Sequence, residues 1–65
     1  MGAGFYPQLL KLFREHGCTH VRQAKGSHEI WFSPVTEKTF SVPVHINHRG
    51  LANAILKTAG IRAKV

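Results

Sequence analysis

Lys25, Gly26, Ser27 and His28 follow one another directly and bring the most chemically useful groups of the chain together. Histidine has an unperturbed pKa of about 6.5, so its imidazole can accept or donate a proton near neutral pH. Glycine lets a backbone approach a ligand closely, and successive backbone amides in a turn can donate hydrogen bonds to a phosphate. These four residues therefore have the chemistry for proton transfer beside a bound phosphate.

Arg22 and Lys25 are the cationic residues closest to His28 in the sequence. Arginine can bind a phosphate through two parallel hydrogen bonds, whereas lysine binds it as a point charge. Metal-free chemistry at a phosphodiester requires a proton to be moved and negative charge to be stabilised on the phosphate. In that chemistry His28 is the acid or base, and the candidate phosphate-binding residues are Arg22, Lys25, Gly26 and Ser27. The alternative is a strand histidine whose ring bonds to a neighbouring carbonyl, and residue chemistry alone favours that alternative.

The composition predicts one small basic domain, residues 1–65, with an ordinary share of apolar residues. Of the 65 residues, 43% are hydrophobic, which is typical of a folded chain. Nine Lys and Arg residues against three Asp and Glu residues give a net charge of +6. This excess favours a polyanionic or acidic partner, and nucleic acid is the commoner of the two.

The single cysteine, Cys18, excludes an internal disulfide framework and fits a reducing cytosol. The chain has no apolar run of about 18 residues and no secretory signal pattern, so we expect a cytoplasmic protein without a membrane contact. His45 and His48, taken with Cys18 or His20, do not match a recognised zinc-ligand spacing. We therefore expect neither a metal nor a cofactor.

An amphipathic helix is predicted near the start of the chain, from residue 5 or 6 to His16. Its apolar stripe recurs at helical spacing and consists of Phe5, Leu9, Leu12 and Phe13. Pro7 is tolerated only in a first helical turn, and Gly17 is the expected left-handed stop. This helix is expected to cover the core.

A second helix is predicted over about residues 49–59, with Asn47 as its N-cap and Gly60 as its stop. Its expected apolar stripe consists of Leu51, Ile55, Leu56 and Ala59. Ile61 is expected to fold back as the hydrophobic partner of the Gly60 stop.

Three short strands are predicted between the helices, over residues 18–24, 28–33 and 39–43, with a turn at residues 25–27. In the first strand, alternation places Thr19, Val21 and Gln23 on one face and Cys18, His20, Arg22 and Ala24 on the other. In the second it places His28, Ile30 and Phe32 on one face and Glu29, Trp31 and Ser33 on the other, and in the third Phe40 and Val42 share a face. The predicted class is α+β in the order α-β-β-β-α, a three-stranded antiparallel sheet with two helices on one face.

Trp31 has two open interpretations. On the uncovered face of the sheet, its indole could stack on a base or anchor a protein partner. If the register shifts by one residue, Trp31 belongs to the core.

The local sequence resembles the HicA family of toxins, which are small mRNA interferases paired with HicB antitoxins. The resemblance rests on the segment Val21 to His28, which contains the family's Arg-Gln-Lys-Gly-Ser-His signature with one extra residue, Ala24. It extends to residues 12–17, to Val42-Pro43 and to residues 51–61, and so covers nearly the whole chain. A Gly-Ser-His tripeptide alone is a weak signal, but this surrounding sequence makes it fairly specific.

The resemblance implies a fold like that of double-stranded-RNA-binding domains and a role for His28 in RNA cleavage. It implies an endoribonuclease toxin that is inhibited by a HicB-like antitoxin masking the His28 surface, with mRNA as the substrate. The chain departs from the family at Cys18, where a bulky apolar residue is usual, and in the histidine-rich loop of residues 44–49. These departures leave substrate preference and the fit to an antitoxin open.

Two other functions remain open. The first is a non-catalytic RNA-binding module on the same fold. Such modules usually carry a lysine cluster at the start of the last helix, and residues 48–53 contain no lysine. The second is a toxin that has lost activity and binds its antitoxin as a co-repressor.

Overall fold

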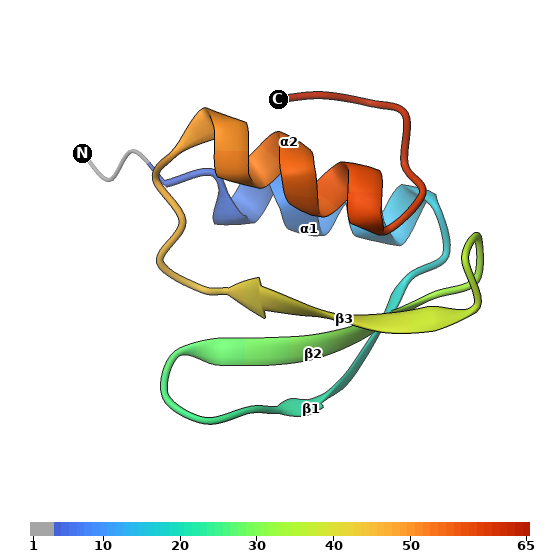
Figure 1. Ribbon diagram of the computed structural model, residues 1–65, viewed down its shortest axis with the longest axis horizontal. Coiled ribbons are helices and arrows are strands. Elements are labelled where there is room, and N and C mark those ends of the chain that lie inside the picture. The colour runs from blue at the N-terminus through green and yellow to red at the C-terminus, as the bar shows by residue number, and fades with distance from the viewer. Residues whose placement is uncertain (1–3) are drawn as a thin grey trace.

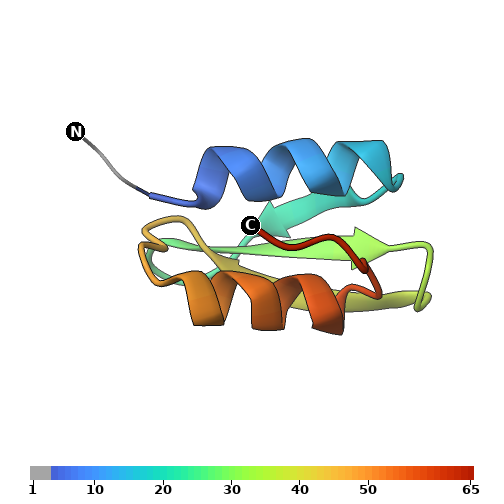
Figure 2. The same cartoon turned by 90° about the horizontal axis from the view of Figure 1, so that it is seen from above.

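The structure, a computed structural model, describes residues 4–65 and contains two helices and three strands. The elements in chain order are α1 (Tyr6–Glu15), β1 (Thr19–Gln23), β2 (His28–Ser33), β3 (Lys38–Pro43) and α2 (Arg49–Thr58). The strands form one antiparallel sheet in the order β1-β2-β3. Both helices lie on one face of this sheet and run in the same direction (Figures 1 and 2). The predicted α+β class and the α-β-β-β-α order are confirmed.

Helix α1 forms where the apolar spacing predicts it, and Leu9 and Phe13 are fully buried. Gly17 has a φ of +79°, which L-residues with a side chain rarely adopt, and it ends the helix as predicted. The amide of Cys18 then donates to the carbonyl of Phe13 at 2.8 Å, so this carbonyl in the last turn of α1 has a hydrogen-bond partner.

Helix α2 begins at Arg49 as predicted, but its N-cap is His48 and not Asn47. Nδ1 of His48 accepts a hydrogen bond from the Leu51 amide at 3.2 Å. The prediction was wrong because it favoured the better capping residue type, whereas the position directly before the helix belongs to His48. At the other end Gly60 has a φ of +79°, and the Ile61 amide donates to the Leu56 carbonyl at 2.8 Å, so the predicted stop is confirmed.

The predicted apolar stripe of α2 is confirmed at Ile55, Leu56 and Ala59 and is wrong only at its first member. Leu51 is 47% exposed, whereas its neighbour Ala52 is fully buried. The buried residues of this stripe are Ala52, Ile55, Leu56 and Ala59.

The two faces of β2 are distinct, but they are reversed relative to the first interpretation of Trp31. Trp31 pairs with Phe40 of β3, and both side chains are buried under the helices. The Trp31 ring lies 5.1 Å from that of Phe13 on α1, so Trp31 belongs to the core. We call the covered side of β2 (Glu29, Trp31, Ser33) the core face, and the uncovered side (His28, Ile30, Phe32) the open face.

Strand β1 does not alternate regularly, because its pairing with β2 shifts between His20 and Arg22. Thr19 pairs with Phe32 and Arg22 pairs with Ile30, so both lie on the open face although three positions separate them. Val21 is the extra residue of this bulge. The predicted strict alternation over residues 18–24 is therefore wrong, and all five residues of β1 are exposed.

A buried hydroxyl joins the end of β2 to the end of α2. Ser33 Oγ donates to the Ala59 carbonyl at 2.6 Å and accepts from the Val35 amide at 3.2 Å. A Cβ on Gly60 would lie 2.7 Å from Cγ1 of Val35, so the turn after β2 packs directly against the helix stop. Neither helix in residues 4–65 has the length and hydrophobicity needed to cross a lipid bilayer.

Candidate functional site

The turn between β1 and β2 is shaped by its backbone. The Ala24 amide donates to the His28 carbonyl at 2.8 Å, and the His28 amide donates to the Lys25 carbonyl at 3.4 Å. Gly26 has a φ of +68°, and a Cβ there would have nothing within 4 Å. Gly26 is therefore required for its backbone conformation, since space around it is open.

Gln23 braces this turn from inside the hairpin. Its Nε2 donates to the carbonyl of His28 at 3.0 Å and to that of Gly26 at 3.4 Å. Gln23 was not among the predicted site residues. Its place in the Arg-Gln-Lys-Gly-Ser-His signature, three residues before Gly26, was the signal in the sequence that could have singled it out.

His28 is the first residue of β2, and its side chain is exposed on the open face. It pairs with Pro43 of β3. The hydrogen bonds at His28 run through its backbone amide and carbonyl, so the ring is placed by the strand and remains accessible to solvent. The alternative was a strand histidine whose ring bonds to a neighbouring carbonyl, and within residues 4–65 the His28 ring makes no such bond.

Three of the five predicted site residues lie in one turn, and the other two lie in the strands on either side of it. Lys25, Gly26 and Ser27 are exposed in the turn itself. Arg22 lies on the open face opposite Ile30, which is two residues from His28 on the same face. Diagonal neighbours of this kind lie about 7–8 Å apart, which is within reach of an arginine side chain.

The loop of residues 44–48 lies against this turn at one end of the molecule (Figure 1). The Val44 amide donates to the Ser27 carbonyl at 2.8 Å and thereby extends the β2–β3 ladder by one step. The Phe5 amide donates to the Ile46 carbonyl at 2.7 Å and joins the same loop to the start of α1. His45 is exposed in this loop, whereas one ring nitrogen of His48 is occupied as the cap of α2.

A half-buried polar cluster lies behind the site, on the core face of β2. Oε1 of Glu29 accepts from the Tyr6 hydroxyl at 2.7 Å and from the Trp31 indole at 3.0 Å. Oε2 of Glu29 lies 3.9 Å from Nε2 of His20, whose ring stands edge-on to Trp31 at 5.5 Å. This Glu29 cluster (Tyr6, His20, Glu29, Trp31) joins α1 to two strands, and sequence analysis missed it.

The cluster shifts two pKa values in opposite directions. Burial raises the pKa of Glu29, but the hydrogen bonds from Tyr6 and Trp31 and the attraction of His20 outweigh it, so the pKa is lowered. Burial, and then the hydrogen bond to Glu29, raise the pKa of Tyr6 to about 12. At neutral pH the Tyr6 hydroxyl is therefore protonated and donates a hydrogen bond to the Glu29 carboxylate.

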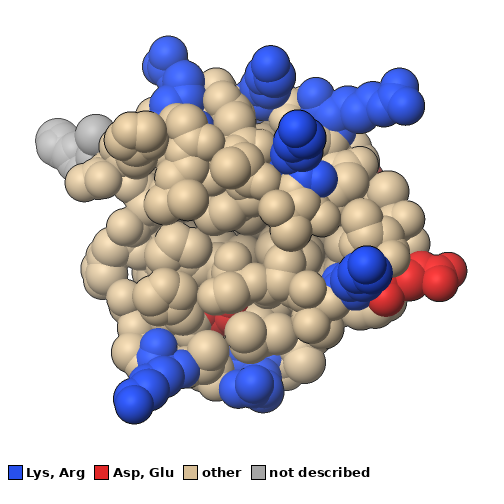
Figure 3. All heavy atoms as spheres, viewed as in Figure 1, with Lys and Arg blue, Asp and Glu red and all other residues tan. Residues whose placement is uncertain are grey.

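The remaining titratable groups are dispersed. Figure 3 shows Lys and Arg side chains projecting around the rim of the visible face, over helices and sheet alike, with little acidic surface between them. Burial raises the pKa of the Cys18 thiol and outweighs the hydrogen bond with Ser33, so Cys18 stays protonated. Within residues 4–65, no three His, Cys, Asp or Glu side chains gather closely enough to hold a metal ion.

The comparisons with known proteins yield one match. Residues 6–61 match a family described as the HicA toxin of bacterial toxin–antitoxin systems. This range runs from the first residue of α1 past the end of α2, so it includes every helix and strand. No curated protein matches the chain. No solved structure matches it.

Proposed function

The chain belongs to the HicA family of toxins of bacterial toxin–antitoxin systems, and we propose that it is an endoribonuclease that cleaves mRNA without a metal. The observation that carries this proposal is the exposed His28 ring beside the Lys25-Gly26-Ser27 turn. An imidazole, a cation and backbone amides lie within four consecutive residues, and in this proposal they contact one phosphodiester together.

In the proposed reaction His28 accepts the proton of a ribose 2′-hydroxyl. The 2′-oxygen forms a bond to the adjacent phosphorus, and the bond from phosphorus to the 5′-oxygen of the next nucleotide breaks. The leaving oxygen takes a proton from water or from a protonated histidine. A positioned general base is typically worth about 10²–10⁴-fold in rate.

The cations and the turn have a separate role in this proposal. Arg22 and Lys25 bind the phosphate oxygens, and the amides of Gly26 and Ser27 donate to the charge that develops on them. Gln23 acts as a positioning residue, since its hydrogen bonds to the His28 and Gly26 carbonyls hold the turn. A ligand at the open face would meet these groups together.

Family membership implies an antitoxin partner, and we propose that a HicB-like protein inhibits the toxin by covering the His28 surface. The protein would act in the cytoplasm, where mRNA is available and where the free thiol of Cys18 remains reduced. An antitoxin that masks a basic surface is expected to be acidic where it makes contact.

The test is RNA cleavage by the purified chain in the presence of a chelator. We expect single-stranded RNA to be cut, and the His28→Ala variant to cut it at least about 10²-fold more slowly. The matched control is Thr39→Ala, an exposed open-face change away from the turn. Equal cleavage by the His28→Ala variant would refute the mechanism. Intact RNA with a retained gel shift would instead support the non-catalytic RNA-binding function.

A further inference from the structure

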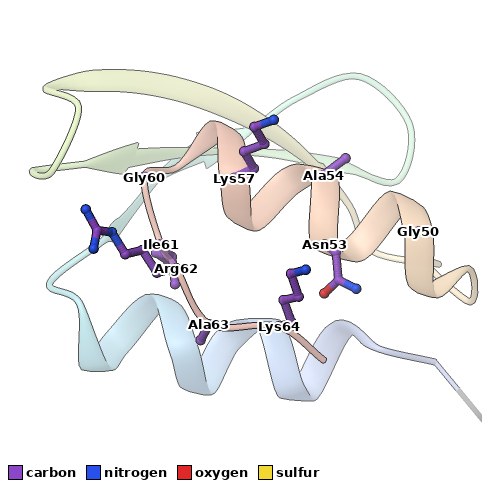
Figure 4. Close-up of a pocket in the computed structure, with 9 residues that line it drawn as sticks. All are labelled: Gly50, Asn53, Ala54, Lys57, Gly60, Ile61, Arg62, Ala63 and Lys64. Carbon is purple, nitrogen blue, oxygen red and sulfur yellow. The ribbon is translucent and has the colours of Figure 1, made fainter.

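A groove lies between α2 and residues 60–65, a segment that turns back after α2 and runs between the two helices (Figures 2 and 4). Its cavity volume is about 550 Å³. Asn53, Ala54 and Lys57 of α2 form one wall, and Ile61, Ala63 and Lys64 of the returning segment form the other (Figure 4). None of the residues assigned to the His28 turn lines it.

The returning segment is fastened at both ends, so the groove has fixed walls. Ile61 is 3% exposed, and its amide donates to the Leu56 carbonyl at 2.8 Å. The Val65 amide donates to Oδ1 of Asn53 at 2.8 Å. Between these two fastenings, the main chain of residues 62–64 makes no backbone hydrogen bond to any other residue from 4 to 65. Its amides and carbonyls are therefore free to pair with an extended ligand.

The groove combines an apolar lining with uncompensated positive charge. Ala54, Ile61 and Ala63 supply apolar surface. Lys64 points across the opening toward Asn53, while Lys57 and Arg62 point outward from the rim (Figure 4). The acidic residues of the chain are Glu15, Glu29 and Glu37, and none of them lines the groove.

We propose that this groove is a docking site for an extended acidic segment of a protein partner. Acidic side chains of the segment would pair with Lys57, Arg62 and Lys64, and its main chain would pair with residues 62–64. The apolar side chains between them would contact Ala54 and Ala63. A nucleic acid backbone would use the cations but not the apolar walls, so the lining favours a peptide.

The groove and the His28 turn lie at different places on the molecule. Figure 1 shows the returning segment above the helices, on the side away from the sheet, whereas the β1–β2 turn lies at the far edge of the sheet. A partner held in the groove would therefore leave the open face accessible to RNA. The inference does not depend on the catalytic role proposed for His28.

The test measures binding of a short fluorescein-labelled peptide of alternating glutamate and valine to the full chain by fluorescence anisotropy. We expect the double variant Lys57→Gln/Lys64→Gln to bind the peptide about fivefold more weakly. Each lysine would lose one exposed ion pair with the peptide, and two such small losses add. The matched control, Lys11→Gln/Lys38→Gln, removes the same charge at exposed positions elsewhere and is expected to bind as the parent does.

Two further arms separate the other ligands. Replacing glutamate by glutamine in the peptide is expected to weaken binding more than the Lys57→Gln/Lys64→Gln variant does, because it also removes the pairing with Arg62. Circular dichroism checks that both double variants fold. Equal losses in the two double variants would overturn the proposal, because binding would then follow net charge alone. A fivefold loss of binding to single-stranded oligouridine in the Lys57/Lys64 variant, with peptide binding unchanged, would show that the groove is a nucleic-acid site and would overturn it as well.

Discussion

The two faces of β2 place side chains of opposite character on alternate residues. On the core face, Glu29, Trp31 and Ser33 make side-chain hydrogen bonds or ring contacts to both helices or to the turns beside them. On the open face, His28 projects into solvent, and Ile30 and Phe32 are only half-buried. The core face of β2 therefore packs against the helices, whereas its open face holds the candidate site residue His28.

This difference shows how a small chain can combine a packed core with an exposed imidazole on the same strand. A domain of 65 residues has a total stability on the order of 5 kcal/mol, so few residues can be exempt from packing. Successive side chains of a strand point to opposite faces of the sheet, so β2 carries packed residues on one face and exposed or half-buried residues on the other without a longer chain. The four predictions that follow test this separation.

Trp31→Ala is expected to have the largest effect, a loss of about 3–5 kcal/mol in the free energy of unfolding. Trp31 is 5% exposed and packs on Phe13, so its removal leaves a cavity between α1 and the sheet. Urea denaturation followed by circular dichroism measures the loss. Its control is Phe32→Ala on the open face, for which we expect a clearly smaller loss; similar values for the two variants would contradict the division into faces.

Ser33→Ala is expected to cost about 1–3 kcal/mol, because the Ala59 carbonyl loses its donor and the Val35 amide its acceptor in a buried site. Ser41→Ala is the matched control, since Ser41 is exposed on the open face, and a change within about 0.5 kcal/mol is expected. Urea denaturation of both variants under the same conditions gives the comparison. A loss of stability in Ser41→Ala as large as that in Ser33→Ala would contradict the difference between the two faces.

The Glu29 cluster predicts a pH dependence of stability at both extremes. Tyr6 has a pKa of about 12 in the folded chain against about 10 when unfolded, so its contribution is present below pH 10 and is lost as the pH rises through 12. The lowered pKa of Glu29 acts in the opposite sense. Its contribution is present above the ordinary value of 4.5 and is lost as the pH falls below it.

Denaturation across this pH range measures both limbs. Tyr6→Phe is expected to flatten the alkaline limb, and Glu29→Gln is expected to flatten the acid limb. An alkaline limb that Tyr6→Phe leaves unchanged would show that another group causes it.

His28→Ala is expected to have the smallest effect on stability, within about 0.5 kcal/mol, because the ring is exposed and the turn is held by backbone bonds and by Gln23. The same denaturation measurement applies. A loss of several kcal/mol would show that His28 has a structural role and would remove the contrast between the two faces.

The parts of the fold that could be predicted depend on local chemistry. Gly17 and Gly60 mark the helix ends because a left-handed backbone is favourable at glycine, and both have positive φ. The bounds of β2 follow from the Gly-Ser turn before it and Pro34 after it. The order of elements follows from such local signals.

The errors arose where the outcome depends on contacts between distant residues. Alternation grouped the side chains of β2 correctly, but only the pairing of Trp31 with Phe40 decides which group meets the helices. The bulge at Val21 interrupts the alternation of side chains in β1, and no residue type in the sequence indicates it. The Tyr6–Glu29 bond joins residues 23 positions apart, so no local pattern reveals it.

For the candidate site, the sequence was sufficient to place its members but not to show what supports them. Lys25, Gly26, Ser27 and His28 are adjacent, so their proximity follows from connectivity. The contact of Val44 with Ser27 and the bracing by Gln23 depend on the folded hairpin. The chemical roles of these residues stay predictions for the cleavage assay.

The β1–β2 turn has one more consequence, which concerns how such a protein can change over generations. Gly26 has open space around it, and Lys25 and Ser27 are exposed, so few substitutions beside the glycine would disturb packing. Substitutions at Lys25 and Ser27 therefore leave the packing of the helices and the sheet unchanged. The sequence of this turn can therefore diverge without first requiring compensating changes in the interior.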